Sequence, residues 1–156
     1  MRIKISQLQA FILAGGQSRR MGRDKSQLLL ENQTFTDRIA ETLLKVTDSV
    51  TLVGAREPHS RFSSVPDLYP EWGALGGLHA ALAASSREWA IVVACDLPFV
   101  TADLFNYLAS LPDGHEAVVP LQLDGRPQPL SSLYRIEPCL QRATELIEAG
   151  KRRPLD

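Results

Sequence analysis

The sequence has few cysteines, no long apolar run and no excess of charge of one sign. Each of these features excludes some classes of protein. No stretch approaches the ~18 apolar residues of a membrane helix. The apolar run at residues 10–14 is shorter than the ~7–15 residues of a secretory signal core. We therefore expect a cytoplasmic protein without a membrane partner. Cys95 and Cys139 lie in apolar stretches, which favours buried free thiols over the alternative of a disulfide.

Positive and negative charges nearly balance, with 17 lysines and arginines against 18 aspartates and glutamates. A broad surface for nucleic acid or for an anionic membrane is therefore not expected. A bound anion has to be met by local positive charge, and residues 19–25 carry such charge. The length of 156 residues and the hydrophobic content of 44% predict a single domain over 1–156 with a real core.

Segments with strand and helix patterns alternate along the chain. Compact apolar runs, of which 88–96 is the clearest, predict strands covered on both faces. Apolar residues at helical spacing predict helices between these strands. The alternation predicts an α/β fold with a mostly parallel central sheet and helices on both faces. The predicted strands are 8–14, 49–54, 88–96, 116–121 and 129–135, with short ones near 26–31 and Val65 in an otherwise irregular 55–77; the predicted helices are 34–46, 76–85, 101–111 and 138–150.

A glycine-rich, basic loop follows the first predicted strand in ILAGGQSRRMGRDKS, residues 12–26. Its spacing matches neither the Walker phosphate loop nor the dinucleotide-binding G-x-G-x-x-G pattern. Adjacent Gly15 and Gly16 at a strand end let backbone N–H groups approach an anion closely. Arg20 and Lys25 add cations that suit a triphosphate. The alternative is a plain strand-to-helix turn with a basic, solvated face.

Three further features place a ligand site at the carboxyl ends of the strands. Gly15 follows the first predicted strand, and Gly54 and Asp96 stand at the carboxyl ends of two others. Ligands of open α/β sheets bind beyond this edge, so we expect the three residues to meet there. A single carboxylate at Asp96 suits Mg²⁺, which keeps substrate phosphates and waters as its other ligands. A turn or capping role before Pro98 is the alternative for Asp96.

The segment LAGGQSRRMGRDK, residues 13–25, resembles the signature loop of nucleotidyltransferases, and most of all that of the molybdenum cofactor guanylyltransferases. Segments 66–82, 93–104 and 125–135 are similar to further blocks of that family. The likeness therefore covers nearly the whole chain. It implies a three-layer, Rossmann-like nucleotidyltransferase fold.

The same resemblance implies a role for individual residues along a bound nucleotide. Arg20, Lys25 and Asp96 are implied to be catalytic. The implied contacts are Leu13, Ala14 and Gly15 to guanine and ribose, Gly16 to the phosphates, Arg20 and Lys25 to the triphosphate, Asp67 to the nucleotide, and Asp96 to Mg²⁺.

The implied activity is transfer of GMP from GTP to the terminal phosphate of molybdopterin, with release of pyrophosphate. A related cytidylyltransferase or sugar-phosphate nucleotidyltransferase is a second interpretation, and a non-catalytic nucleotide-binding accessory protein is a third. Gly54 stands where the family often has a base-reading Asn, so base selectivity is expected to rest on backbone groups or a neighbour. The family's closing segment with an Asn-Thr-Pro motif is not found up to Asp156, so we expect a C-terminal segment to be missing. Oligomeric state is not indicated.

The stretch between the second and third main strands gives weaker signals. Asp67 is by itself an ordinary loop aspartate, and its role rests on the resemblance. Gly76 and Gly77 either bend the backbone past a ligand or punctuate the chain before a helix. His79 lies in that alanine-rich helix, where we expect it half-buried and hydrogen-bonded. The three histidines do not have metal-ligand spacing.

Overall fold

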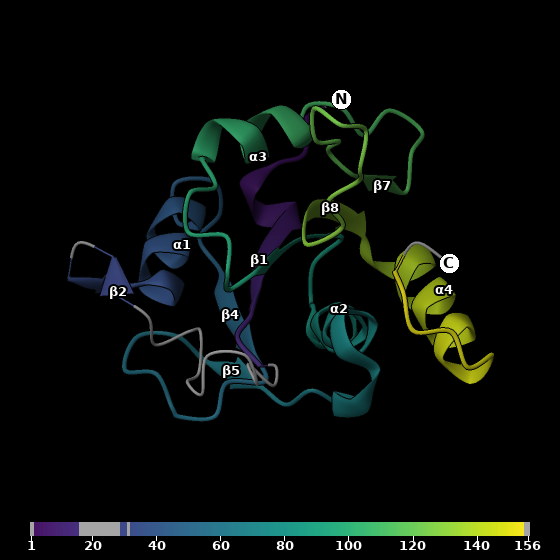
Figure 1. Ribbon diagram of the computed structural model, residues 1–156. Coiled ribbons are helices and arrows are strands. Elements are labelled where there is room, and N and C mark those ends of the chain that lie inside the picture. The colour runs from purple at the N-terminus through teal and green to yellow at the C-terminus, as the bar shows by residue number, and fades with distance from the viewer. Residues whose placement is uncertain (1, 16–28, 31, 155–156) are drawn as a thin grey trace.

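A six-stranded mixed sheet forms the centre of the protein (Figure 1). The computed structural model describes residues 2–15, 29–30 and 32–154. The first four strands in spatial order are parallel, and the last two are antiparallel to their neighbours. The prediction of a mostly parallel sheet is therefore confirmed. In spatial order the strands are β5 (Ser64–Val65), β4 (Val50–Val53), β1 (Leu8–Leu13), β6 (Trp89–Ala94), β8 (Ser131–Arg135) and β7 (Ala117–Val118).

Helices cover both faces of this sheet, which gives the three predicted layers (Figure 1). One face carries α1 (Phe35–Leu43) and α3 (Ala102–Leu108), and the other carries α2 (Gly73–Ala84) and α4 (Ile136–Glu148). None of the helices in the described part of the chain is long and apolar enough to pass through a membrane. The remaining described elements are the 3₁₀ turns η1 (Ile5–Gln7) and η3 (Pro70–Trp72) and a hairpin of β2 (Leu29–Leu30) with β3 (Gln33–Thr34).

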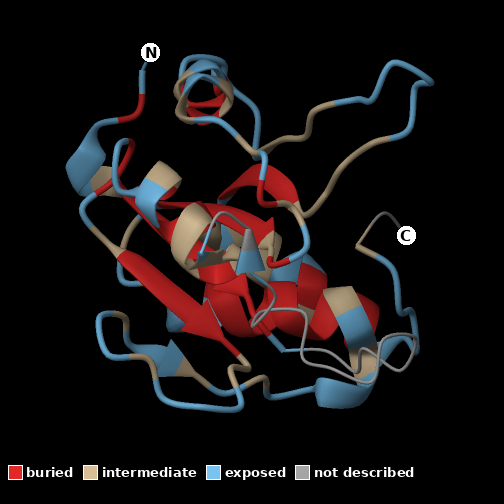
Figure 2. Ribbon diagram, turned by 60° about the vertical axis from the view of Figure 1, so that its left-hand side comes forward, coloured by how far each residue is buried: buried red, intermediate tan, exposed pale blue. Residues whose placement is uncertain are grey.

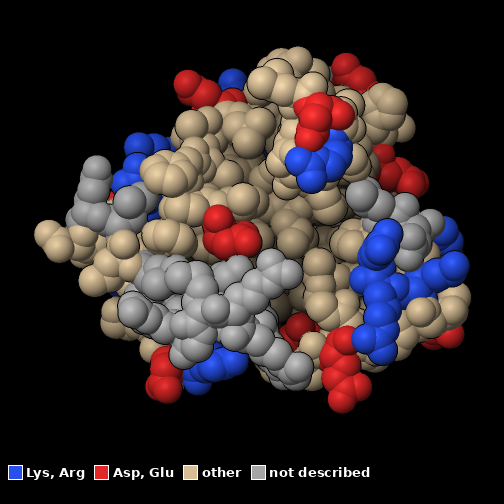
Figure 3. Space-filling view, in the orientation of Figure 1, with Lys and Arg blue, Asp and Glu red and all other residues tan. Residues whose placement is uncertain are grey.

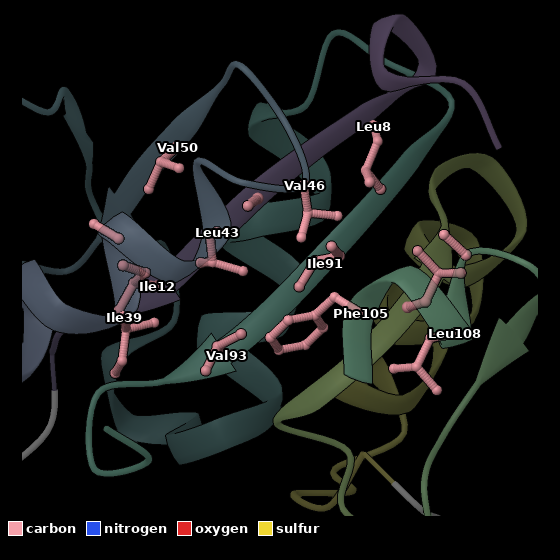
Figure 4. Packing of buried hydrophobic residues seen from close by; sticks show 14 of the residues in the cluster. Leu8, Ile12, Ile39, Leu43, Val46, Val50, Ile91, Val93, Phe105 and Leu108 are labelled. Carbon is pink, nitrogen blue, oxygen red and sulfur yellow. The ribbon is translucent and has the colours of Figure 1, made fainter. Parts of the chain in front are cut away.

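Strand β1 is buried along its whole length, because it lies between β4 and β6 and under helices on both sides. Figure 2 shows that the centre of the sheet is coloured as buried. Alternate side chains of a strand point to opposite faces. Leu8, Ala10 and Ile12 therefore join the core beneath α1 and α3, whereas Phe11 and Leu13 join the core beneath α2 and α4. Figure 4 shows the first of these cores, in which side chains of β1, β4 and β6 meet those of α1 and α3.

Two threonines begin helices, and each uses its hydroxyl in the same way. The Thr34 side chain accepts a hydrogen bond from the Asp37 amide at 3.0 Å, and Thr101 accepts one from Leu104 at 3.2 Å. Such N-caps satisfy one of the free amides in the first turn of a helix. The helix predicted over 101–111 thus begins directly after Thr101.

The start of α2 differs from the sequence prediction. The helix begins at Gly73, three residues before the predicted start, so Gly76 and Gly77 lie inside the helix and not at its beginning. A Cβ atom on Gly76 would lie 2.2 Å from the carbonyl oxygen of Tyr69, and one on Gly77 would lie 3.0 Å from Cδ1 of Leu13. These glycines therefore permit close packing of α2 against the preceding turn and against β1, and they do not mark a break before the helix.

Neither Cys95 nor Cys139 forms a disulfide, as the sequence favoured. Cys95 is buried, and the half-buried Cys139 donates its thiol proton to the Glu116 carbonyl at 3.3 Å. Burial, and to a smaller extent the negative charge of Glu116, raises the pKa of Cys139 to about 11.

We expect Cys139 to react slowly with a thiol-specific disulfide reagent in the folded protein. Because the thiolate is the reactive form, labelling at pH 8 should be roughly 10²-fold slower than for an ordinary cysteine. The rate should rise with pH until the solution reaches the pKa of about 11. A Cys139→Ser variant identifies the signal, because the reaction assigned to Cys139 must then disappear. Fast, stoichiometric labelling of Cys139 at pH 8 would contradict this expectation.

Candidate functional site

Three strand ends meet at one edge of the sheet, as the sequence predicts. Leu13, at the end of β1, pairs with Val53 of β4 on one side and with Ala94 of β6 on the other. The amide of Cys95 donates to the Leu13 carbonyl at 3.2 Å, which extends the pairing by one residue. Gly15 and Asp96 each lie two residues beyond this pair, and Gly54 follows Val53 directly. The two glycines and the aspartate therefore enter their loops side by side.

Gly15 and Gly54 are in direct backbone contact. A Cβ atom on Gly15 would lie 2.8 Å from the Gly54 carbonyl oxygen, which is closer than real Cβ atoms approach. Gly54 has a positive φ of 69°, and a Cβ atom on it would lie 3.3 Å from Cα of Gly15. The amides of Ala14 and Gly15 both donate to the Val53 carbonyl, at 2.9 and 3.1 Å. The protein therefore uses the Gly15 amide to join β1 to β4.

Asp67 extends the same surface from the end of β5. Its Cβ atom lies 3.6 Å from the position of a Cβ on Gly54, so the half-buried carboxyl group stands beside the two glycines. Oδ1 of Asp67 accepts a hydrogen bond from the Tyr69 amide at 2.9 Å. This is the local turn that aspartate side chains favour, and it fixes one carboxylate oxygen to the main chain.

Asp96 is exposed at the carboxyl end of β6. Within residues 2–15, 29–30 and 32–154, no three His, Cys, Asp or Glu side chains gather closely enough to enclose a metal ion. A single exposed carboxylate is nevertheless the donor set that Mg²⁺ takes when substrate phosphates and waters complete its shell. The residues present therefore fit Mg²⁺ held jointly with a phosphorylated substrate.

Leu13 and Ala14 are buried, with 8% and 3% of their surfaces exposed. The Leu13 side chain lies under Gly77 of α2, which is possible because Gly77 has no side chain. The two residues would contact a ligand through their main chains, because their side chains belong to the core. The other residues expected in the loop, Gly16, Arg20 and Lys25, lie outside the described residues.

His79 is a component of this region that the sequence interpretation missed. It is buried, with 8% of its surface exposed, and its Nδ1 atom has no hydrogen-bond partner among the described residues. The histidine is therefore more buried than predicted, and the predicted hydrogen bond is absent at Nδ1. The reason is the close approach of Gly76 to Tyr69, whose ring meets the imidazole edge-on at 5.0 Å between centroids and 82° between planes.

Burial and a neighbouring carboxylate act on His79 in opposite directions. Burial lowers the pKa of the imidazole because it disfavours the charged form, and the negative charge of Asp67 partly offsets this effect. The net shift is downward from 6.5, so the ring is neutral at pH 7. The only sequence signal for this environment is a histidine in a helix otherwise built of small and apolar residues.

Charges of both signs are interspersed over the described surface that Figure 3 presents. Basic side chains gather only as a small group at its right-hand side. This distribution agrees with the net charge of −1. On the face shown, the described residues do not form a broad surface of one sign.

Known proteins share both the sequence and the fold. Residues 10–156 match the family described as the MobA-like NTP transferase domain. A probable molybdenum cofactor guanylyltransferase of Clostridium perfringens is 36% identical over 129 residues, which cover 81% of this chain and 65% of that protein. A second probable molybdenum cofactor guanylyltransferase, of Pelotomaculum thermopropionicum, is 34% identical over 153 residues, which cover 96% of this chain and 74% of that protein.

A solved structure of a similarly named protein shares the fold of this chain. The crystal structure of molybdopterin-guanine dinucleotide biosynthesis protein A from Archaeoglobus fulgidus superposes with a TM-score of 0.73 at 25% identity. The match covers 94% of this chain and 78% of that one. The three-layer nucleotidyltransferase fold implied by the signature loop is thereby confirmed. With the match running from Ala10 of β1 to Asp156, the chain belongs to the MobA-like NTP transferase family.

Proposed function

We propose that this protein transfers GMP from GTP to the terminal phosphate of molybdopterin and releases pyrophosphate. The observation that carries the proposal is the double pairing of Leu13, which brings Gly15, Gly54 and Asp96 to one sheet edge next to Asp67. Support also comes from two relatives, at 36% and 34% identity, that are named as probable molybdenum cofactor guanylyltransferases. The chain spans 65% of the first of these relatives, so the activity of the whole protein is part of the proposal.

The proposed reaction requires that the acceptor phosphate and GTP are positioned and that the negative charge of the phosphates is neutralised. An oxygen of the acceptor phosphate forms a bond to the α-phosphorus of GTP, while the bond from that phosphorus to the bridging oxygen of the β-phosphate breaks. The acceptor phosphate is already ionised, so no general base is needed. Arg20 and Lys25 would neutralise the charge that grows on the departing pyrophosphate.

Asp96 would hold Mg²⁺ at the edge of the sheet. When bound, the ion supplies concentrated positive charge to phosphate oxygens. Asp67 would contact the nucleotide with the carboxylate oxygen that the Tyr69 amide does not hold. The main chains of Leu13, Ala14 and Gly15 would line the base and ribose.

The choice of base is the first test of this proposal. Neither Gly15 nor Gly54 carries a side chain that could read guanine, and a cytidylyltransferase with the same loop is the second candidate. Calorimetry with GTP and with CTP, each in the presence of Mg²⁺, separates the two. We expect GTP to bind and CTP to bind far more weakly. Preference for CTP would favour the cytidylyltransferase.

Turnover is the second test. Pyrophosphate should be released when GTP, Mg²⁺ and molybdopterin are all present, and not when molybdopterin is omitted. Binding of GTP without pyrophosphate release in the full-length protein would instead indicate a nucleotide-binding accessory role.

Replacement of Lys25 by Ala should reduce turnover by roughly 10²-fold, the scale of a lost charge-stabilising donor. Folding stability should fall by less than turnover does, because the role implied for Lys25 is to bind the triphosphate. Steady-state kinetics and urea unfolding measure the two quantities. Lys45→Ala is the matched control, because Lys45 is an exposed lysine just beyond α1. Equal activity of the Lys25→Ala and Lys45→Ala proteins would remove Lys25 from the mechanism.

A further inference from the structure

A buried histidine with an unpaired nitrogen is an unusual feature of the second core. His79 is 8% exposed, and Nδ1 has no hydrogen-bond partner in the described part of the chain. Buried polar atoms are paired in the great majority of cases, and an unpaired one needs an explanation. The neighbours of His79 are Tyr69, whose ring contacts it, and Asp67, whose charge acts on it.

The unpaired nitrogen indicates which tautomer the ring adopts. A neutral imidazole has one N–H donor and one lone pair. Buried N–H groups without a partner are rarer than under-satisfied acceptors, which indicates that the lone pair lies on Nδ1. The proton then lies on Nε2. The negative charge of Asp67 acts on this ring and favours a bound proton.

Helix α2 holds the turn from Asp67 to Tyr69 at two points. The carbonyl of Tyr69 lies against Gly76, where only a glycine leaves room for it. The Tyr69 ring lies edge-on to His79, one helical turn further along α2. The Tyr69 amide in turn holds Oδ1 of Asp67 at 2.9 Å. A continuous set of contacts therefore runs from His79 through Tyr69 to Asp67, and Asp67 stands beside Gly54.

We propose that His79 is a positioning residue, whose neutral imidazole holds the turn from Asp67 to Tyr69 against Gly54 and so places the Asp67 carboxylate for the nucleotide. The inference rests on the proposed function, since it takes a nucleotide to bind beside Asp67. Because His79 is buried, no direct contact with the ligand is assigned to it. It acts through Tyr69 and Asp67.

The alternative is that His79 only fills space in the core, and matched substitutions separate the two roles. Leu at position 79 keeps an apolar side chain of similar size, whereas Gln places an amide nitrogen near the position of Nε2. Both residues form helices well, so differences between them report on the side chain. Removing an unpaired buried polar atom does not destabilise a protein in the way that breaking a pair does, so His79→Leu should fold at least as stably as the natural protein.

The experiment measures Mg²⁺-GTP affinity by calorimetry, together with the KM for GTP and kcat, in the full chain. We expect His79→Leu to raise the dissociation constant and the KM for GTP about tenfold, with little change in kcat. The reason is that the turn would then hold the Asp67 carboxylate less firmly in place. His79→Gln should restore both constants to within about threefold. In an Asp67→Ala background, His79→Leu should cause no further loss, because residues acting through one contact are not additive.

Several outcomes would overturn the inference. One is natural GTP affinity in His79→Leu. Another is equal loss in the Gln and Leu proteins, and a third is additive loss with Asp67→Ala. If His79→Leu fails to fold, the GTP affinities of His79→Gln and His79→Asn are compared instead. Asn places its nitrogen near the position of Nδ1, so His79→Asn should not rescue binding. The proposed function fails separately, when the natural protein itself binds no GTP; the inference then falls with it.

Discussion

Replacing Asp96 with Asn should lower turnover by roughly 10²–10³-fold, because the carboxylate charge that attracts Mg²⁺ is lost while the shape of the side chain is kept. Asp96 is exposed and has no ion-pair partner among the residues that the structure describes. The unfolding free energy should therefore change by less than about 0.5 kcal/mol. Initial rates of pyrophosphate release across a Mg²⁺ titration measure the effect.

The control for this change is Asp48→Asn. Asp48 precedes β4 and so lies at the opposite edge of the sheet, where it pairs with Arg87 at 2.6 Å. An exposed pair of this kind contributes only about 0–1 kcal/mol, and turnover should not change. If the Asp96→Asn protein keeps natural turnover at every Mg²⁺ concentration, Asp96 is not the metal ligand.

Replacing Gly76 with Ala should destabilise the protein by about 2 kcal/mol. The added methyl group would lie 2.2 Å from the Tyr69 carbonyl oxygen, which is a backbone atom and can move only with its turn. Overpacking of this kind costs about 1–3 kcal/mol, and the gain of up to about 1 kcal/mol in helix propensity does not offset it. Urea unfolding measures the change, and GTP affinity should fall as well because the turn carries Asp67.

Gly77→Ala is the matched control on the same helix. Its methyl group would meet the end of the Leu13 side chain at 3.0 Å, and a side-chain end adjusts more easily than a backbone carbonyl. The gain in helix propensity is the same, so Gly77→Ala should be clearly more stable than Gly76→Ala. Equal stability of the two variants would show that the contact between Gly76 and Tyr69 does not constrain the turn.

The architecture was predictable because the main strands and helices have recognisable local sequence patterns. The wholly apolar β6 and the helical spacing in α1 are visible in the sequence, and alternation of the two patterns leads to the layered sheet. The boundaries of α2 were not predictable. In the sequence, Gly73, Gly76 and Gly77 look like a loop before the helix. The close contacts of Gly76 with the Tyr69 backbone and of Gly77 with the Leu13 side chain explain why two of these glycines lie within it.

The candidate site was predictable as a location and less so in its contacts. Strand ends that share an edge bring Gly15, Gly54 and Asp96 together, and this follows from topology alone. The contact between Gly15 and Gly54 and the enclosure of His79 depend on how two distant segments pack, which no local pattern encodes. The roles assigned to Gly16, Arg20 and Lys25 stay predictions from the signature loop.

The central place of β1 links the integrity of this site to that of the entire sheet. Because β1 hydrogen-bonds to β4 on one side and to β6 on the other, the edge beyond Leu13 exists only when both ladders are intact. Segments about forty and eighty residues away along the chain must be assembled before any ligand can dock. A bound nucleotide would then oppose cooperative opening of all three strands at once, and amide exchange would slow throughout them together.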